Sequence, residues 1–228
     1  MSHFPVTISC ARRPWPEMST PYDQIAGQNV ERLAALSDGI FAVAMTLLVL
    51  DLHTPAASAI HSERDLWRAL VALSPQLLVY MMTFLTLGIF WVGQQTQLNF
   101  LARSHRSFAW IHIVFLFAVT LTPFTTMLLA GFLSYRLALL FYWLNILLLG
   151  VALYFSWNCA TDLGLAKADM LPEIPGAIKR RIVTAQSLYA FGALLCVFST
   201  YVSIAFIVIV QLNYAIAPRF SRRSEVAS

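Results

Sequence analysis

Long apolar segments separated by short polar connections follow one another from residue 32 to residue 217. A helix needs about 20 apolar residues to cross the hydrocarbon core of a bilayer. The segments predict six membrane-spanning helices, at about residues 33–52, 69–92, 108–129, 136–157, 182–198 and 202–217. The last two divide an uncharged run of 36 residues, which is too long for one ordinary span. We therefore predict an all-α integral membrane protein whose six-helix domain covers residues 32–218.

Composition and charge agree with this interpretation. Hydrophobic residues make up 59% of the chain and charged residues 11%, whereas about a quarter of the residues in a soluble domain are charged. Of the 15 lysines and arginines, 12 fall on the side of the membrane that holds both chain ends. By the positive-inside rule, this predicts cytoplasmic tails at residues 1–31 and 219–228. Met18 offers an alternative start, which leaves open whether residues 1–17 belong to the native protein.

The first predicted helix carries one acidic side chain, Asp38, within the apolar run from Leu33 to Leu50. A charge at that depth costs a few kcal/mol, so it normally faces protein or water and has a partner. A helical wheel at about 100° per residue places an apolar stripe on the face opposite Asp38. This apolar stripe comprises Leu36, Gly39, Val43, Leu47 and Leu50, with Arg32 at one end and Thr46 on its shoulder. Arg32 and Asp38 are too far apart in helical register to pair directly, so we expect each to find a partner on another helix.

These residues resemble the RxxxFSD signature of the transmembrane protein 175 family, which comprises endolysosomal potassium channels and their shorter bacterial relatives. The resemblance rests on Arg32, the triplet Leu36-Ser37-Asp38, Gly39, Phe41 and the run Thr46-Leu47-Leu48. Leu36 stands where the family has phenylalanine, which keeps the position apolar. The resemblance implies a homotetramer in the bacterial inner membrane, with the pore formed by the first helix of each subunit.

The same resemblance assigns roles to individual positions. Val43, Thr46 and Leu50 match pore-lining residues, and Leu47 joins them because it lies on the apolar stripe. Val43 would form the narrow apolar ring and Thr46 a ring of hydroxyls that potassium contacts transiently. A structural network is assigned to a second set of residues, Arg32, Ser37, Asp38, Trp91, Gln94 and Gln95.

The end of the second predicted span departs from the family. There a tryptophan is followed by histidines that bond the arginine of the first helix, whereas this chain has Gln94 and Gln95 after Trp91. Glutamine forms hydrogen bonds but does not titrate, so pH sensitivity carried by such a histidine should be absent. The alternative for Trp91 is a place in the interfacial aromatic belt. His112, in the third span, is interpreted as bonded to a backbone carbonyl, with a proton site as the alternative.

Other classes of membrane protein find little support in the sequence. No nucleotide-binding loop, GxSxG or HExxH motif occurs, which argues against an ATP-driven pump and against a membrane enzyme. We expect no cofactor, no fixed metal ion and no nucleic-acid partner. The sequence predicts a potassium-permeable cation channel that conducts passively through a hydrophobic constriction, with potassium ions and lipid as its partners. The alternative is a secondary transporter or a proton-permeable leak protein of the same architecture, and the absence of a TVGYG filter leaves ion selectivity open.

Overall fold

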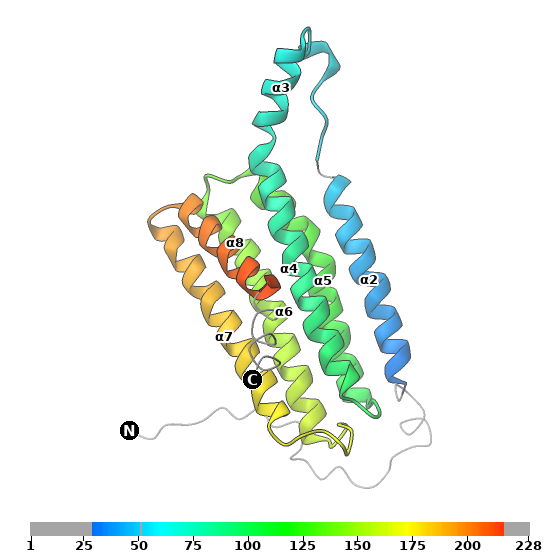
Figure 1. The fold of residues 1–228 in the computed structure, drawn as a ribbon. Helices are drawn as coiled ribbons and strands as arrows, with labels where there is room; N and C mark the ends of the chain where they lie inside the picture. The colour runs from blue at the N-terminus through cyan, green and yellow to red at the C-terminus, as the bar shows by residue number, and fades with distance from the viewer. Residues whose placement is uncertain (1–28, 51, 217–228) are drawn as a thin grey trace, which may run out of the picture.

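The computed structural model describes residues 29–50 and 52–216 of the chain. The remaining parts of the two predicted tails, with Met18, lie outside the described residues. The described part is helical apart from an isolated β-bridge between Leu101 and Ala166, so the all-α prediction is confirmed (Figure 1). Its α-helices are α2 (Val30–Leu50), α3 (Glu63–Ala72), α4 (Ser74–Asn99), α5 (Arg106–Gly131), α6 (Arg136–Asp162), α7 (Ile174–Leu194) and α8 (Thr200–Ile216), and two short 3-10 helices are η1 (Ala57–Ala59) and η2 (Leu195–Val197).

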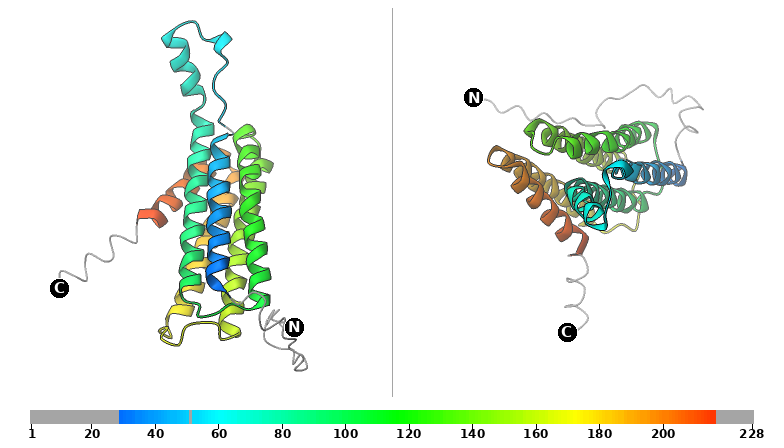
Figure 2. Two further views of the ribbon diagram at one scale, coloured as in Figure 1. Left: turned by 90° about the vertical axis from the view of Figure 1, so that its right-hand side faces the viewer. Right: turned by 90° about the horizontal axis from the view of Figure 1, so that it is seen from above.

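The helices form one bundle in which α2 occupies an edge. Helices α5 and α6 make the most extensive contact, α2 packs on α5 and α4, and α7 packs on α6 and α8. Seen along the bundle axis, α2 lies at one side, while α7 and α8 lie at the other (Figure 2). The first helix therefore has neighbours within the subunit on only part of its circumference.

Four of the described helices, α2, α4, α5 and α6, are long and apolar enough to cross a membrane. The remaining two helices of the bundle differ from them. Helix α7 contains the basic run Lys179-Arg180-Arg181, just before the predicted start of the fifth span at residue 182, and α8 is a shorter apolar helix. The described part of the chain thus contains four helices that can cross a membrane by length and composition, as expected for an integral membrane protein.

The second predicted span, 69–92, is divided differently in the structure. Helix α3 begins after Ser62, whose side chain accepts a hydrogen bond from the backbone N–H of Asp65, and it ends at Ala72. Helix α4 then starts with Pro75 in its first turn, where the missing N–H of proline leaves no bond unmade. It continues to Asn99, so Gln94 and Gln95, which follow the predicted end at residue 92, lie inside the helix. Helix α3 projects past the end of the bundle (Figure 1).

The connection after α6 brings three helix ends together. Gly164 adopts the left-handed conformation, with φ of 62°, which a residue without Cβ reaches at no steric cost. The N–H of Leu165 donates to the carbonyl of Ala160, which satisfies a carbonyl left free at the helix end. The N–H of Lys167 then donates to the carbonyl of Phe100, just after α4. The ends of α4 and α6 and the start of α7 therefore lie at the same end of the bundle.

Candidate functional site

Helix α2 has one buried face and one exposed face. Its buried residues are Ser37, Phe41, Ala44 and Leu48, and the Phe41 ring lies 6.0 Å from that of Phe115 on α5. The exposed face consists of Arg32, the apolar stripe and Thr46. Within it Val43 is 57% exposed and Leu50 69% exposed, although the helix is closely packed on its other side. A continuous, mainly apolar face of α2 is thus uncovered in the single subunit.

Ser37 joins α2 to two other helices through a buried polar cluster. Its hydroxyl donates to the carbonyl of Leu33 at 2.8 Å and accepts from Nε2 of Gln94 on α4 at 3.0 Å. Nε2 of His112 on α5 lies 2.8 Å from the same hydroxyl oxygen and 3.3 Å from Nε2 of Gln94. All three side chains are at most 1% exposed. Burying polar groups costs free energy unless they are hydrogen-bonded. This cluster therefore fixes the position of α2 along the bundle and its rotation about its own axis.

Asp38 attaches α2 to α4 one residue later. Its Oδ1 accepts a hydrogen bond of 2.7 Å from the indole N–H of Trp91 and one of 2.6 Å from Nε2 of Gln95. The sequence had left the partner of Asp38 open, and the structure supplies two on the neighbouring helix. The carboxylate is nevertheless exposed in the single subunit. Asp38 therefore makes its hydrogen bonds at the rim of the α2–α4 interface and not in a buried pocket.

Arg32 does not join this network. Its backbone N–H donates to Oδ1 of Asn29 at 3.0 Å, and its exposed side chain forms no ion pair within the described residues. The glutamines that stand where the family has histidines bond to Ser37 and Asp38 instead. The structure thus brings together five of the six predicted network residues and leaves the arginine apart from them.

The predicted hydroxyl ring residue, Thr46, has its hydroxyl turned toward its own helix. Oγ1 lies 3.0 Å from the carbonyl of Ala42 and 2.9 Å from that of Val43, and it donates to them. A hydroxyl has one proton and two lone pairs, so the oxygen keeps its ability to accept. The side chain is exposed beside Val43. An oxygen ligand is thus available on the same face of α2 as the apolar stripe.

A groove follows the apolar stripe where α2 meets α5. It has a volume of about 410 Å³, and its walls include Leu36, Val43 and Leu47 of α2 with Thr120 and Pro123 of α5. Pro123 lies within α5, and the hydroxyls of Thr122 and Thr126 donate to carbonyls of the preceding turn. The two acceptors are the carbonyls of Ala118 and Thr122, and between them in the chain lies the carbonyl of Val119, which the proline leaves without its helical donor. The apolar stripe is therefore flanked by an apolar recess.

His112 is the member of the site that the sequence did not connect to α2. It is 75 positions from Ser37, and helical periodicity relates residues only within one helix. The available signal was a single histidine in an otherwise apolar span, since such side chains usually face the interior of the bundle and pair there. Among the described residues, no group of three His, Cys, Asp or Glu side chains is arranged to hold a metal ion.

Residues 32–123 match the model of a family described as the endosomal/lysosomal potassium channel TMEM175. A potassium channel of Streptomyces collinus is 37% identical over 102 residues, which cover 45% of this chain and 48% of that protein. A potassium channel of Chamaesiphon minutus is 34% identical over 102 residues, with coverage of 45% and 50%. The match therefore spans about half the length of these curated relatives, and it includes α2 and the whole Ser37–Asp38 network.

The likeness in structure extends further along the chain. The crystal structure of a lysosomal potassium-selective channel TMEM175 homologue from Chamaesiphon minutus matches with a TM-score of 0.71 and 26% sequence identity. This match covers 82% of the present chain and 97% of the solved one. Taken together, the three comparisons confirm the resemblance seen in the sequence: this chain is related to the TMEM175 family of ion channels.

Proposed function

We propose that the chain is one subunit of a potassium-permeable channel that conducts ions passively, without enzymatic activity. The observation that carries this proposal is the uncovered face of α2. Ser37, Asp38 and Phe41 hold the helix in a fixed rotation, and this leaves Val43, Leu50 and their neighbours exposed on the other side. A fixed helix with one free apolar face at the edge of a subunit suits a pore built from several copies.

A pore around α2 requires several copies of the subunit. A single copy of the apolar stripe cannot surround an ion, whereas four copies related by rotation about an axis can. We infer a homotetramer with one α2 helix from each subunit around the pore, as the resemblance implies. The groove between α2 and the Pro123 region of α5 offers space for an apolar side chain of a neighbouring α2. Symmetric closure of identical subunits is also the usual form of homo-oligomers.

Two rings of side chains, at Val43 and at Thr46, would determine how the proposed pore interacts with ions. An apolar ring at Val43 would oppose the passage of hydrated ions because water leaves a narrow apolar constriction, which is a known way of gating. A ring at Thr46 would offer hydroxyl oxygens that replace part of the hydration shell of a potassium ion. Leu47 and Leu50 extend the apolar lining toward the C-terminal end of α2. Binding near Thr46 is expected to be transient, since conduction requires that an ion also leaves.

We further propose six membrane spans, with α7 and α8 as the fifth and sixth, and cytoplasmic tails at both ends. The α-helices α2, α4, α5 and α6 support the first four by length and composition. The basic residues at the start of α7 and beyond α8 favour the cytoplasmic side for those ends. A bacterial inner membrane is the location that fits this charge pattern and the bacterial relatives.

Flux measurements on purified protein in liposomes test this function. With potassium inside and an impermeant cation outside, we expect potassium efflux that follows the gradient without ATP or a co-ion. Parallel assays with sodium and with a proton-sensitive dye rank the three ions. Val43→Phe, which would fill the constriction, is the matched negative control. Uptake of potassium against its gradient, driven by protons or sodium, would favour the secondary transporter, and proton flux without potassium flux would favour the proton leak.

A further inference from the structure

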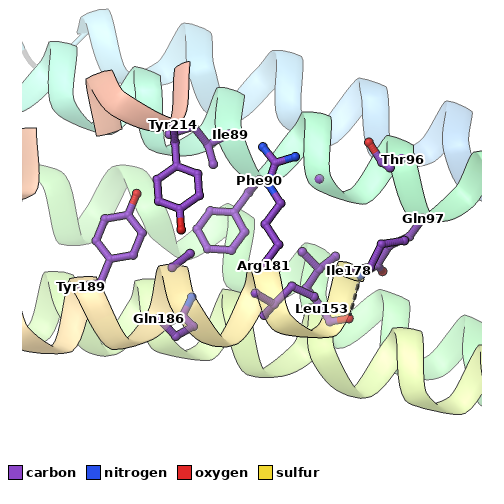
Figure 3. Close-up of a pocket in the computed structure, with 13 residues that line it drawn as sticks. Ile89, Phe90, Thr96, Gln97, Leu153, Ile178, Arg181, Gln186, Tyr189 and Tyr214 are labelled. Atoms are coloured by element: carbon purple, nitrogen blue, oxygen red, sulfur yellow. Dashed lines mark hydrogen bonds between the residues drawn. The ribbon is translucent and has the colours of Figure 1, made fainter. Parts of the chain in front are cut away.

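A second pocket lies on the opposite side of the bundle from the apolar stripe. It is enclosed by α4, α6, α7 and α8, has a volume of about 100 Å³ and is shown in Figure 3. Its walls run along α4 from Ile89 to Gln97 and along α7 from Ile178 to Tyr189. Eleven residues of helix correspond to roughly 16 Å, so the pocket is elongated along the bundle axis. It shares no lining residue with the groove beside α2.

The lining of this pocket combines apolar walls with one cation. Phe90, Leu153 and Ile182 contribute aliphatic and aromatic surface, and Arg181 enters from α7. The Arg181 guanidinium carbon lies 5.9 Å from the centre of the Tyr214 ring, which α8 places across the pocket (Figure 3). A cation over an aromatic face is held there by the electrostatic attraction of the ring. Arg181 is exposed, and its contact with Tyr214 places its guanidinium beside the pocket.

Arg181 lacks an acidic partner on the helices that surround it. Helices α4, α7 and α8 contain no aspartate or glutamate, and the single acidic residue of α6, Asp162, is its last residue and lines a different pocket. Arg181 forms no ion pair within the described residues. A cation at the cytoplasmic membrane surface, where this end of α7 is proposed to lie, attracts anionic groups. The helices around this pocket provide none.

The floor of the pocket also has polar atoms without partners. Tyr189 is 2% exposed, and within the described part of the chain its hydroxyl has no hydrogen-bond partner. Oε1 of the half-buried Gln186 is in the same situation. In Figure 3 the hydroxyl ends of Tyr189 and Tyr214 are turned toward each other inside the pocket. Buried polar groups are almost always hydrogen-bonded, so these atoms are available to bond a polar group that enters the pocket.

We propose that this pocket binds the head of an anionic phospholipid, with its phosphate at Arg181. The Tyr189 hydroxyl would donate to a further oxygen of the lipid, and the apolar walls would contact the beginning of its acyl chains. Basic pockets between membrane helices on the cytoplasmic side are known to bind anionic lipid head groups. A free inorganic anion would satisfy Arg181 but would leave the apolar walls without a partner. The proposal depends on the membrane location of the protein and not on ion conduction.

Native mass spectrometry and thermal unfolding of the full chain in a zwitterionic detergent test the proposal. The probes are phosphatidylglycerol, phosphatidylcholine with the same acyl chains, and inorganic phosphate. We expect phosphatidylglycerol alone to remain bound and to raise the Tm. Equal effects of phosphatidylcholine would show that the pocket does not recognise charge, and equal effects of inorganic phosphate would show a free-anion site. Either result would overturn the proposal.

Point variants distinguish lipid binding in the pocket from lipid binding to the basic surface around it. Arg181→Gln should weaken phosphatidylglycerol binding about fivefold, the effect typical of one basic residue at an anionic lipid. Arg181→Lys should keep most of the binding, and Arg180→Gln is the matched control because Arg180 is exposed like Arg181 but does not line the pocket. Equal losses for positions 180 and 181 would overturn the proposal. Tyr189→Phe preserves the packing and the arginine, so weaker lipid binding by this variant supports the site even if Arg181→Gln fails to fold, and unchanged binding contradicts it.

Discussion

The indole N–H of Trp91 donates a hydrogen bond of 2.7 Å to the carboxylate of Asp38, and Gln95 donates to the same oxygen. One residue earlier, Ser37 is linked to Gln94 and His112 in the buried cluster. Two adjacent residues of α2 therefore contact two different helices through directed bonds. Since hydrogen bonds depend on direction as well as distance, the pair determines which side of α2 remains free.

Substitutions of Asp38 should affect assembly more than ion selectivity. Asp38→Asn retains an oxygen at the Oδ1 position but loses the charge that strengthens both bonds, and we expect a loss of about 1 kcal/mol in stability. Asp38→Leu removes both bonds at the exposed rim of the interface, so its cost should be roughly 1 to 3 kcal/mol, the net value of two hydrogen bonds. Size-exclusion profiles and Tm report these losses. A well-assembled Asp38→Asn channel with altered ion selectivity would show that the carboxylate faces the ion path.

The buried cluster gives a second prediction. Ser37→Ala removes the hydroxyl that Gln94 and His112 contact, and this should destabilise the protein by about 1 to 3 kcal/mol because the partners lose a hydrogen bond inside the bundle. Ser156→Ala on α6 is the matched control. Ser156 is 1% exposed, and its hydroxyl has no hydrogen-bond partner within the described residues, so its loss should be nearly neutral. Equal shifts in Tm for the two variants would contradict the role of the Ser37 cluster.

The length of the apolar runs predicted the bounds of helices that end at an abrupt change of polarity. It predicted less well the bounds of helices that continue into polar residues. The first helix, expected at 33–52, is found at Val30–Leu50. The second was expected to end at residue 92, yet α4 continues to Asn99 because the amide nitrogens of its glutamines find acceptors within the bundle: Gln94 bonds Ser37, and Gln97 bonds the carbonyl of Leu153. Hydropathy assigns each residue an average cost of burial. It cannot include partners that only the folded bundle provides.

The network residues show the same limit. The motif pointed to Ser37, Asp38, Trp91, Gln94 and Gln95, and the structure brings these side chains together. The pairing of Ser37 with His112 depends on how α2 and α5 are packed, which periodicity within one helix does not contain. The expected partner of Arg32 is likewise absent from the described residues of the subunit. The pore-lining roles of Val43, Thr46, Leu47 and Leu50 remain predictions.

Thr46 offers a test of ion coordination. Thr46→Val keeps the branched shape and removes a hydroxyl from each subunit, so we expect lower potassium flux or weaker discrimination between potassium and sodium. Because the Thr46 proton is already donated to carbonyls of the same helix, the substitution leaves no buried partner unpaired across an interface, and the fold should persist. Thr46→Ser keeps the oxygen and should behave like the natural protein. Liposome flux with each ion measures the difference, and identical flux in Thr46→Val would remove Thr46 from the pathway.

Val43 gives the sharpest test because its size can be changed without disturbing the subunit. Its side chain is 57% exposed, and substitutions at such positions usually change stability by less than about 0.5 kcal/mol. Val43→Ala should widen and hydrate the constriction and raise the flux, and Val43→Phe should close it. The control is Met45→Ala, since Met45 is half-buried and packs against the core of the bundle. This substitution should lower the Tm and leave the flux per assembled channel unchanged.

Cysteine substitution determines which face of α2 borders the ion path. In conducting channels, Val43→Cys and Thr46→Cys should react with a permeant thiol reagent and lose flux, whereas Met45→Cys should be protected by its packing. Of the three natural cysteines, Cys159 and Cys196 are buried and Cys10 lies outside the described residues, so the background rate is measured on the unsubstituted protein. Exposure alone does not distinguish a pore from a lipid-facing surface, but a water-soluble reagent does, because it reaches a side chain only through water. If position 45 is modified while positions 43 and 46 stay inaccessible, the pore lies on the other face of α2.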